Sequence, residues 1–170
     1  MRNLMLISVL LLGLGGCATY EPVPKDYTGP TAVVGDTGLA EDGSKARIFA
    51  LMKVDGNAID NAFAASAYAS SGHGAALTPV FPERKVPVRP MKVVIRGSHA
   101  TGAPIQALAS QLAGTFFSVE GTVEFTPEAD HVYKVKGELF WRAKVFDIQD
   151  APDAVRAVFF KKNPGRNGEF

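Results

Sequence analysis

Two stretches in the second half of the chain alternate apolar and polar residues, and they limit the possible folds more than any other feature. In the first, from Phe117 to Phe125, apolar or small residues alternate with Ser, Glu and Thr. In the second, from Tyr133 to Trp141, they alternate mainly with Lys and Glu. A period of two is typical of a half-buried strand. With TPEADH as the turn between them, the two stretches are predicted to pair as an antiparallel hairpin with one dry and one charged face.

Other segments also favour strands. The run KARIFALMKV, Lys45–Val54, leads into Asp55-Gly56, which is a strong turn signal and predicts a hairpin or tight bend. Met91–Gly97 again alternates apolar and basic residues, and 11 prolines and 17 glycines supply many turns. The chain is therefore predicted to be mainly β, an antiparallel β-sandwich of six to eight strands with one or two short helices.

The secondary structure of three segments is not decided by their sequence. The alanine-rich stretch 62–69 favours a helical turn inside a long excursion that ends around Pro79 and Pro82. Segment 104–113 has Ile105, Leu108 and Leu112 at helical spacing, but its alternate residues also suit a strand. Segment 150–160 fits either a short helix begun by an Asp150 cap or an edge strand over 155–160.

The N-terminus has the pattern of an export signal. Arg2 gives the first residues a positive charge, and an apolar run from Leu4 to Leu14 follows. Eleven residues are too few for a helix to cross a hydrocarbon core of roughly 30 Å. The run therefore predicts the apolar region of a signal peptide.

The end of this run resembles the lipobox of bacterial lipoproteins. Leu14, Gly15, Gly16 and Cys17 match its aliphatic residue, two small residues and cysteine, and Cys17 is the only cysteine in the chain, so it has no partner for an intrachain disulfide. The resemblance implies cleavage between Gly16 and Cys17, a diacylglycerol on the Cys17 thiol and an acyl group on its new amino terminus. Two or three acyl chains would make a durable anchor.

Two alternatives accompany the lipobox interpretation. An ordinary secretory signal would be cleaved after Gly16 or Ala18. The residue after Cys17 is Ala18, whereas an aspartate at this position marks retention in the inner membrane of enterobacteria. Position 18 therefore favours the periplasmic face of the outer membrane over the inner membrane.

The predicted organisation follows from these features. Residues 1–16 form the lipoprotein signal peptide and 17–30 an extended tether, in which prolines 22, 24 and 30 oppose regular structure. Residues 31–160 form the β-sandwich, and 161–170 form a polar C-terminal tail.

A second, looser resemblance covers Lys45–Leu139. The elements KARIFALMKVDGNAI, PVRPMKVVIRG and VEFTPEADHVYKVKGEL are similar to a set of small domains in bacterial envelope lipoproteins. The resemblance implies a β-sandwich on a lipid anchor. The long insertion between residues 60 and 86 departs from that set.

The balance of charge argues against nucleic acid as a partner. The formal net charge is +1, and apart from Arg2 the acidic and basic side chains are equal in number. The sequence therefore lacks the basic footprint that binding of a polyanion needs.

Few residues suggest chemistry. His73, His99 and His131 have no metal-ligand spacing to another candidate ligand, and we expect no metal, no cofactor and no catalytic residue. Ser70 and Ser71 lack a nucleophile elbow. Candidate carboxylate pairs for hydrolysis come from Glu83, Glu120, Glu124, Glu128 and Asp130.

Adjacent aromatic residues raise the question of an exposed apolar patch. Phe116 and Phe117, like Phe140 and Trp141, should point to opposite sides of a strand. One of each pair would lie in the core, and the other either in a protein-binding patch or in a second buried layer. We favour the second buried layer.

The sequence thus predicts a lipid-anchored envelope protein, a non-enzymatic accessory or binding module at the periplasmic face of the outer membrane. Its partners would be the membrane, through the lipid on Cys17, and an envelope protein. The alternative is an envelope ligand-binding protein or hydrolase that uses loop region 60–86, with His73 and nearby hydroxyls as its polar groups.

Overall fold

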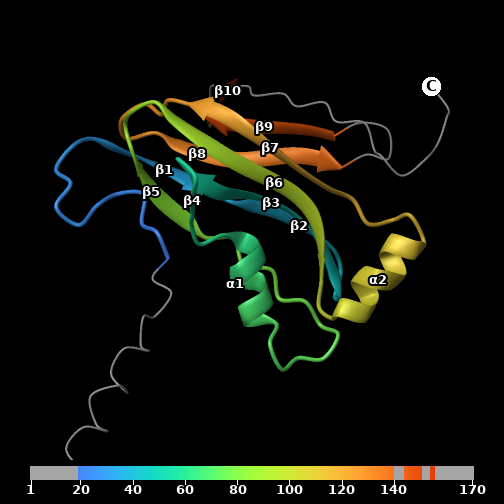
Figure 1. The fold of residues 1–170 in the computed structure, drawn as a ribbon. Coiled ribbons are helices and arrows are strands. Elements are labelled where there is room, and N and C mark those ends of the chain that lie inside the picture. The colour runs from blue at the N-terminus through green and yellow to red at the C-terminus, as the bar shows by residue number, and fades with distance from the viewer. Residues whose placement is uncertain (1–18, 140–143, 151–153, 156–170) are drawn as a thin grey trace, which may run out of the picture.

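Two β-sheets and two helices make up the part of the protein that the structure describes (Figure 1). The computed structural model describes residues 19–139, 144–150 and 154–155. Sheet A has the order β10-β9-β8-β1-β5. Its strands are β1 (Thr31–Gly35), β5 (Glu83–Pro87), β8 (Val132–Leu139), β9 (Lys144–Asp150) and β10 (Ala154–Val155).

Sheet B has the order β2-β3-β6-β7, and β4 pairs with the far end of β3. Its strands are β2 (Thr37–Asp42), β3 (Lys45–Val54), β4 (Asn57–Ala58), β6 (Met91–Thr101) and β7 (Ser118–Phe125). The predicted sandwich is confirmed, and eight of the described strands have five residues or more. One pair departs from the predicted antiparallel arrangement, because β1 and β8 run parallel.

The main core lies between the two sheets. Both contribute apolar side chains to it, and most of these are less than 5% exposed. Sheet A gives Ala32, Val34, Val86, Tyr133 and Val135, and sheet B gives Phe49, Leu51, Val54, Met91, Val93, Ile95, Val119 and Phe125. The alternation along β6 and β7 therefore marks the face that packs against sheet A.

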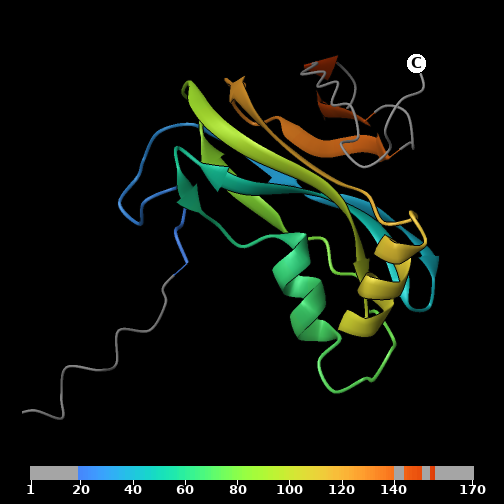
Figure 2. The same ribbon diagram turned by 45° about the vertical axis from the view of Figure 1, so that its right-hand side comes forward.

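A smaller core covers the other face of β3. Helix α1 (Ala62–Ala69) packs there, and its Ala62 joins Ala46, Ile48 and Ala50. Strand β3 is thus buried on both faces, which explains why KARIFALMKV is nearly continuously apolar rather than alternating. The view in Figure 2 shows α1 beneath sheet B.

The predicted hairpin between the stretches 117–125 and 133–141 is wrong. Both form strands, but β7 pairs with β6 in sheet B, whereas β8 pairs with β1 and β9 in sheet A. The connection TPEADH therefore crosses from one sheet to the other. Alternation indicates which face of a strand is buried, and it is the same whether two successive strands pair or face each other across a sandwich.

Local contacts hold this crossing in place. The Asp130 backbone N–H donates to Thr31 O at 2.9 Å, and Asp130 has a left-handed φ of 61°. The Tyr133 hydroxyl accepts the Glu128 N–H at 2.9 Å, and its ring packs edge-on against Phe125, with centroids 5.0 Å apart. The crossing thus places β8 beside β1 and closes the core.

The structure also resolves the segments that the sequence left open. Residues 62–69 form α1, and 104–112 form a second helix, α2 (Pro104–Leu112). Of the segment 150–160, Asp150 ends β9 and residues 154–155 form the short strand β10, whereas 151–153 and 156–160 lie outside the described residues. Residues 19–30 contain no helix or strand, yet Pro22 is buried against the domain.

Helix α2 stands apart from both cores. None of its residues is buried, and Ile105, Leu108 and Leu112 are 69%, 51% and 83% exposed. Neither α1 nor α2, the helices of the described residues, has the length and apolar character needed to cross a membrane.

Candidate functional site

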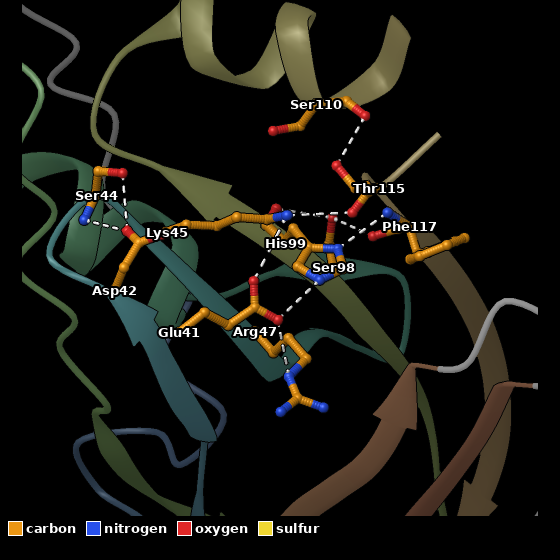
Figure 3. A network of polar contacts seen from close by, with 10 residues as sticks. All are labelled: Glu41, Asp42, Ser44, Lys45, Arg47, Ser98, His99, Ser110, Thr115 and Phe117. Carbon is orange, nitrogen blue, oxygen red and sulfur yellow. Dashed lines mark hydrogen bonds and ion pairs between the residues drawn. The ribbon is translucent and has the colours of Figure 1, made fainter. Parts of the chain in front are cut away.

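A buried histidine lies at the end of sheet B next to α2 (Figure 3). His99, on β6, is 6% exposed. Its Nδ1 accepts the Phe117 backbone N–H at 3.0 Å, and its Nε2 lies 3.2 Å from Glu41 Oε1. Because Nδ1 accepts a hydrogen bond, the neutral ring carries its proton on Nε2 and donates it to Glu41.

Glu41, on β2, forms ion pairs with two cations beside His99. Lys45 Nζ lies 3.5 Å from Glu41 Oε2, and Arg47 Nε lies 3.1 Å from Glu41 Oε1. Arg47 Nε lacks the direction of a hydrogen bond, so its interaction with Glu41 is electrostatic. Lys45 also donates to Thr115 O at 3.2 Å, which connects the segment after α2 to sheet B. We call Glu41, Lys45, Arg47 and His99 the His99 cluster.

The surroundings of His99 keep its ring neutral. Burial lowers its pKa from the ordinary 6.5, which outweighs the opposing pull of the Glu41 carboxylate. The rings of Phe116 and Phe117 flank the imidazole, with centroids 5.9 and 5.7 Å away. Both phenylalanines are partly buried and directly precede β7, and Phe117 also packs against the main core.

The geometry of the His99 cluster suits positioning rather than proton transfer. A His–Glu pair is a familiar part of a catalytic triad, but there the second ring nitrogen faces a nucleophile. Here that nitrogen is occupied by the Phe117 amide. The neighbouring Ser98 hydroxyl donates to the backbone oxygens of His99 and Phe117, at 3.0 and 3.3 Å.

A second buried polar group joins four elements. Asp36, just after β1, is 2% exposed, and Arg84 of β5 binds it through two hydrogen bonds of 2.8 Å. Asp36 Oδ1 also accepts the Leu51 N–H of β3 at 2.9 Å. Its Oδ2 accepts the Ala62 N–H at the start of α1 at 2.8 Å.

This arrangement satisfies a charge that would otherwise destabilise the core. A buried carboxylate needs a partner and hydrogen bonds to offset its lost hydration. Asp36 has both, and its position at a helix N-terminus adds a favourable interaction with the helix dipole. The Asp36–Arg84 pair is therefore part of the scaffold.

Two hydroxyls, one within α1 and one on the residue that caps its C-terminus, hold the segment that follows the helix. Ser66 Oγ accepts the Val80 N–H at 2.8 Å. Ser70 Oγ accepts the Thr78 N–H at 2.8 Å and donates to Ser66 O at 2.7 Å. Ser70, one of the hydroxyls near His73 that the alternative function would use, is thus occupied in fixing the excursion against its own helix, whereas Ser71 is exposed.

The other two histidines lie apart from these contacts. His73 is exposed in the turn after α1. His131 contacts Ala129 O through Nδ1 at 2.9 Å, a local bond of the kind expected for a turn residue. In the described part of the chain, no three His, Cys, Asp or Glu side chains gather closely enough to hold a metal ion.

The candidate carboxylates are spread over both sheets. Glu120 pairs with Arg96 at 2.6 Å on sheet B, and Glu83 pairs with Lys134 on sheet A. Glu124 is exposed and lies opposite Lys92 in the register of β6 and β7. Glu128 and Asp130 lie on the crossing between β7 and β8. The structure therefore does not bring this set together in one cleft.

An open groove of about 480 Å³ lies where the segment before β1 meets the domain. Tyr20, Pro22 and Val23 form one side of it. The other side comes from Ile59 and Asp60, directly before α1, and from residues 82–85 at the start of β5. The groove thus marks where the N-terminal segment rests on the domain.

Several predicted residues lie outside the described ranges. They are Gly16 and Cys17 of the lipobox, the pair Phe140 and Trp141, and the tail 161–170. The predictions made for them stand as predictions.

Comparison with known proteins adds no relative. The chain matches no protein-family model, no curated protein and no solved structure. The resemblance to envelope lipoproteins therefore remains an expectation from the motifs.

Sequence reasoning missed Asp36, Glu41 and Arg84. Asp36 had a usable signal, because it is a lone acid directly after the apolar strand TAVVG. Glu41 had none, since 58 positions separate it from His99 in the sequence.

Proposed function

We propose that this chain is a lipid-anchored protein of the bacterial cell envelope. One observation carries the proposal: an apolar run of signal-peptide length ends in Leu14, Gly15, Gly16 and the sole cysteine, Cys17. In the proposed mature protein, Cys17 is the first residue and bears the acyl chains. Residues 17–30 link it to the sandwich that begins at β1.

The sandwich serves as a non-enzymatic accessory or binding module at the periplasmic face of the outer membrane. This part of the proposal is supported by how the buried polar groups are used. Both ring nitrogens of His99, both oxygens of Asp36 and the Ser70 hydroxyl bind other parts of the fold. Groups committed in this way stabilise a scaffold and leave recognition to its surface.

The anchor is tested by replacing the thiol. In an enterobacterial host grown with labelled palmitate, the parent chain should take up label and float with membranes. Cys17→Ala should lose both, because the thioether bond to diacylglycerol needs the sulfur. Ala18→Ser is the matched control, and it should retain label and flotation. Unchanged labelling of Cys17→Ala would overturn the anchor.

The choice of membrane is tested in the same host. Ala18→Asp introduces the residue that marks inner-membrane retention there. The parent should fractionate with the outer membrane and Ala18→Asp with the inner membrane. A parent chain found in the inner membrane would contradict the outer-membrane part of the proposal while leaving the lipid anchor intact.

A further inference from the structure

We propose that one end of the domain lies directly on the bilayer, with the apolar face of α2 in contact with lipid. This end, which we call the uncharged end, consists of α1, residues 70–82 and α2. The inference rests on the proposed lipid anchor, and it adds an orientation and a second contact with the membrane.

The uncharged end is distinguished by its composition. Residues 61–82 and residues 97–119 contain no Asp, Glu, Lys or Arg. Figures 1 and 2 both show α1, the loop after it and α2 on the same side of the sandwich. The two segments touch, because a Cβ added to Gly102 would lie 2.2 Å from Ala75 O. The fold thus gathers two uncharged segments into one surface.

This end exposes apolar side chains in an ordered way. Ile105, Leu108 and Leu112 repeat at helical spacing and are each at least 51% exposed, so they form one stripe along α2. Ala109 lies on the same stripe and is also exposed. On α1, Tyr68 is 87% exposed. Tyrosine suits the boundary between lipid and water, where its ring and hydroxyl meet different surroundings.

The position of the anchor favours lipid as the occupant. Tyr20 and Pro22 rest beside Ile59 and Asp60, which directly precede α1, and beside Pro82, which ends the uncharged loop. Cys17 is three residues before Tyr20, so the two cannot be more than roughly 11 Å apart. Acyl chains on Cys17 therefore enter the bilayer near α1.

Tethering makes even a modest contact effective. A group held close to a surface by a short linker meets it at a high effective concentration. The α2 stripe needs only to add apolar burial to an attachment already made by the anchor. Because the uncharged end has no Lys or Arg side chains, this contact should depend little on anionic lipid or on salt.

The charged groups near this end are paired among themselves. Lys45 and Arg47 of the His99 cluster both pair with the Glu41 carboxylate, and Lys45 also binds Thr115 O in the segment after α2. Arg96 lies over the Phe63 ring of α1, 5.9 Å from its centroid, and binds Glu120. These groups border the uncharged end without lying on the α2 stripe.

The test uses the full, lipidated chain in phosphatidylcholine vesicles. A nitroxide is attached at Ala109→Cys, in the middle of the stripe, while the lipid occupies the Cys17 sulfur. The matched control is Lys136→Cys, an exposed position on β8 of sheet A. Oxygen concentrates in lipid and a nickel chelate stays in water. The label at 109 should therefore relax more with oxygen, and the label at 136 more with the chelate.

A second pair of variants tests the side chains. Adding Leu108→Ser and Leu112→Ser to the Ala109→Cys chain should abolish its oxygen preference while flotation persists. Leu39→Ser, which removes a 58% exposed leucine on β2, should leave the preference unchanged. All these side chains are exposed, so the variants should fold. Adding phosphatidylglycerol to the vesicles, or salt to the buffer, should leave the oxygen preference of the label in the Ala109→Cys chain unaltered.

Each outcome has a distinct meaning. A chain that floats with vesicles but keeps the 109 label in water contradicts the inference and leaves the anchor standing. Short distances between 109 labels on different chains would show a second copy on the stripe and would also overturn it. A chain that carries no lipid and does not float contradicts the anchor, and the inference with it.

Discussion

The backbone N–H of Phe117 donates to Nδ1 of the buried His99 at 3.0 Å. That bond exists only while the imidazole is neutral, because protonation turns Nδ1 into a donor facing another donor. It joins the residue directly before β7 to β6, close to the segment in which Lys45 binds Thr115 O. The stability of this part of sheet B is therefore linked to pH.

We predict that the free energy of unfolding decreases as the pH falls below 6.5. Burial lowers the pKa of His99 below that value in the folded chain, so the unfolded chain binds the proton more readily. Well above pH 6.5 the His99 ring is neutral in both the folded and the unfolded chain, so it adds no slope to the free energy of unfolding. Between 6.5 and the lowered pKa it contributes a slope of at most about 1.4 kcal/mol per pH unit, and below that pKa the slope ends. Urea titrations at several pH values measure it.

His99→Gln should remove this slope, and His131→Gln, at a turn position, should retain it. The lowered pKa values of Asp42 and Asp55 do not interfere. They arise first from the backbone N–H groups of Ser44 and Lys92, and both lie below 3.8, so those carboxylates act at more acidic pH. If the free energy of unfolding fell equally steeply with pH in the parent and in His99→Gln, His99 would not be the source of the pH dependence.

The buried pair of Asp36 and Arg84 should be among the most sensitive sites to substitution. Asp36→Asn leaves Arg84 without its counter-charge and replaces one acceptor oxygen by a donor. We expect a loss of about 3–5 kcal/mol in the free energy of unfolding, as for other broken buried pairs. Chemical denaturation measures this loss.

The exposed pair of Arg96 and Glu120 provides the control. Both side chains are more than 40% exposed, although their closest atoms are only 2.6 Å apart. Glu120→Gln should change stability by about 1 kcal/mol or less, because water screens exposed pairs. Similar losses of stability for Asp36→Asn and Glu120→Gln would mean that burial of an ion pair does not determine how much stability its disruption removes.

Periodicity predicted the strands well and their pairing poorly. The bounds of KARIFALMKV coincide with β3, and the alternation of 117–125 matches β7. Yet β7 and β8 lie in different sheets, since the contacts of Asp130 and Tyr133 that make the crossing leave no mark on alternation. A pattern that shows which face of each strand is buried carries no information on which strands pair along their edges.

The polar groups were harder to predict than the strands. His99 looked like an isolated histidine because Glu41 and Phe117 come to it from β2 and from the segment before β7. The α2 stripe was visible as Ile105, Leu108 and Leu112, but spacing alone did not show that its apolar face is exposed. Burial of a helix face depends on which sheet lies beneath it, and the spacing of apolar residues along the helix does not show that.

The hydroxyl of Ser70 should matter more than that of its neighbour Ser71. Ser70→Ala removes the acceptor of the Thr78 N–H, and leaving a partly buried amide unpaired costs about 1–3 kcal/mol. Ser71→Ala, at an exposed position, should stay within about 0.5 kcal/mol of the parent. Hydrogen exchange of the Thr78 amide gives a local measure, and it should quicken in Ser70→Ala alone. Equal exchange in both variants would show that the hydroxyl does not hold this segment.

Two neighbouring positions on β7 test which of its faces meets sheet A. Val123 packs against the main core, whereas Thr122 is exposed. Val123→Asp places a charge against that core and should lower the free energy of unfolding by several kcal/mol, since a carboxylate loses its hydration among apolar side chains. Thr122→Asp puts the same charge on the outer face and should lower it by about 1 kcal/mol or less. Thermal melts of both variants measure the difference. If Val123→Asp melted with the parent, the face assigned to β7 would be wrong; if both variants lost stability equally, charge on this strand, rather than burial, would be the cause.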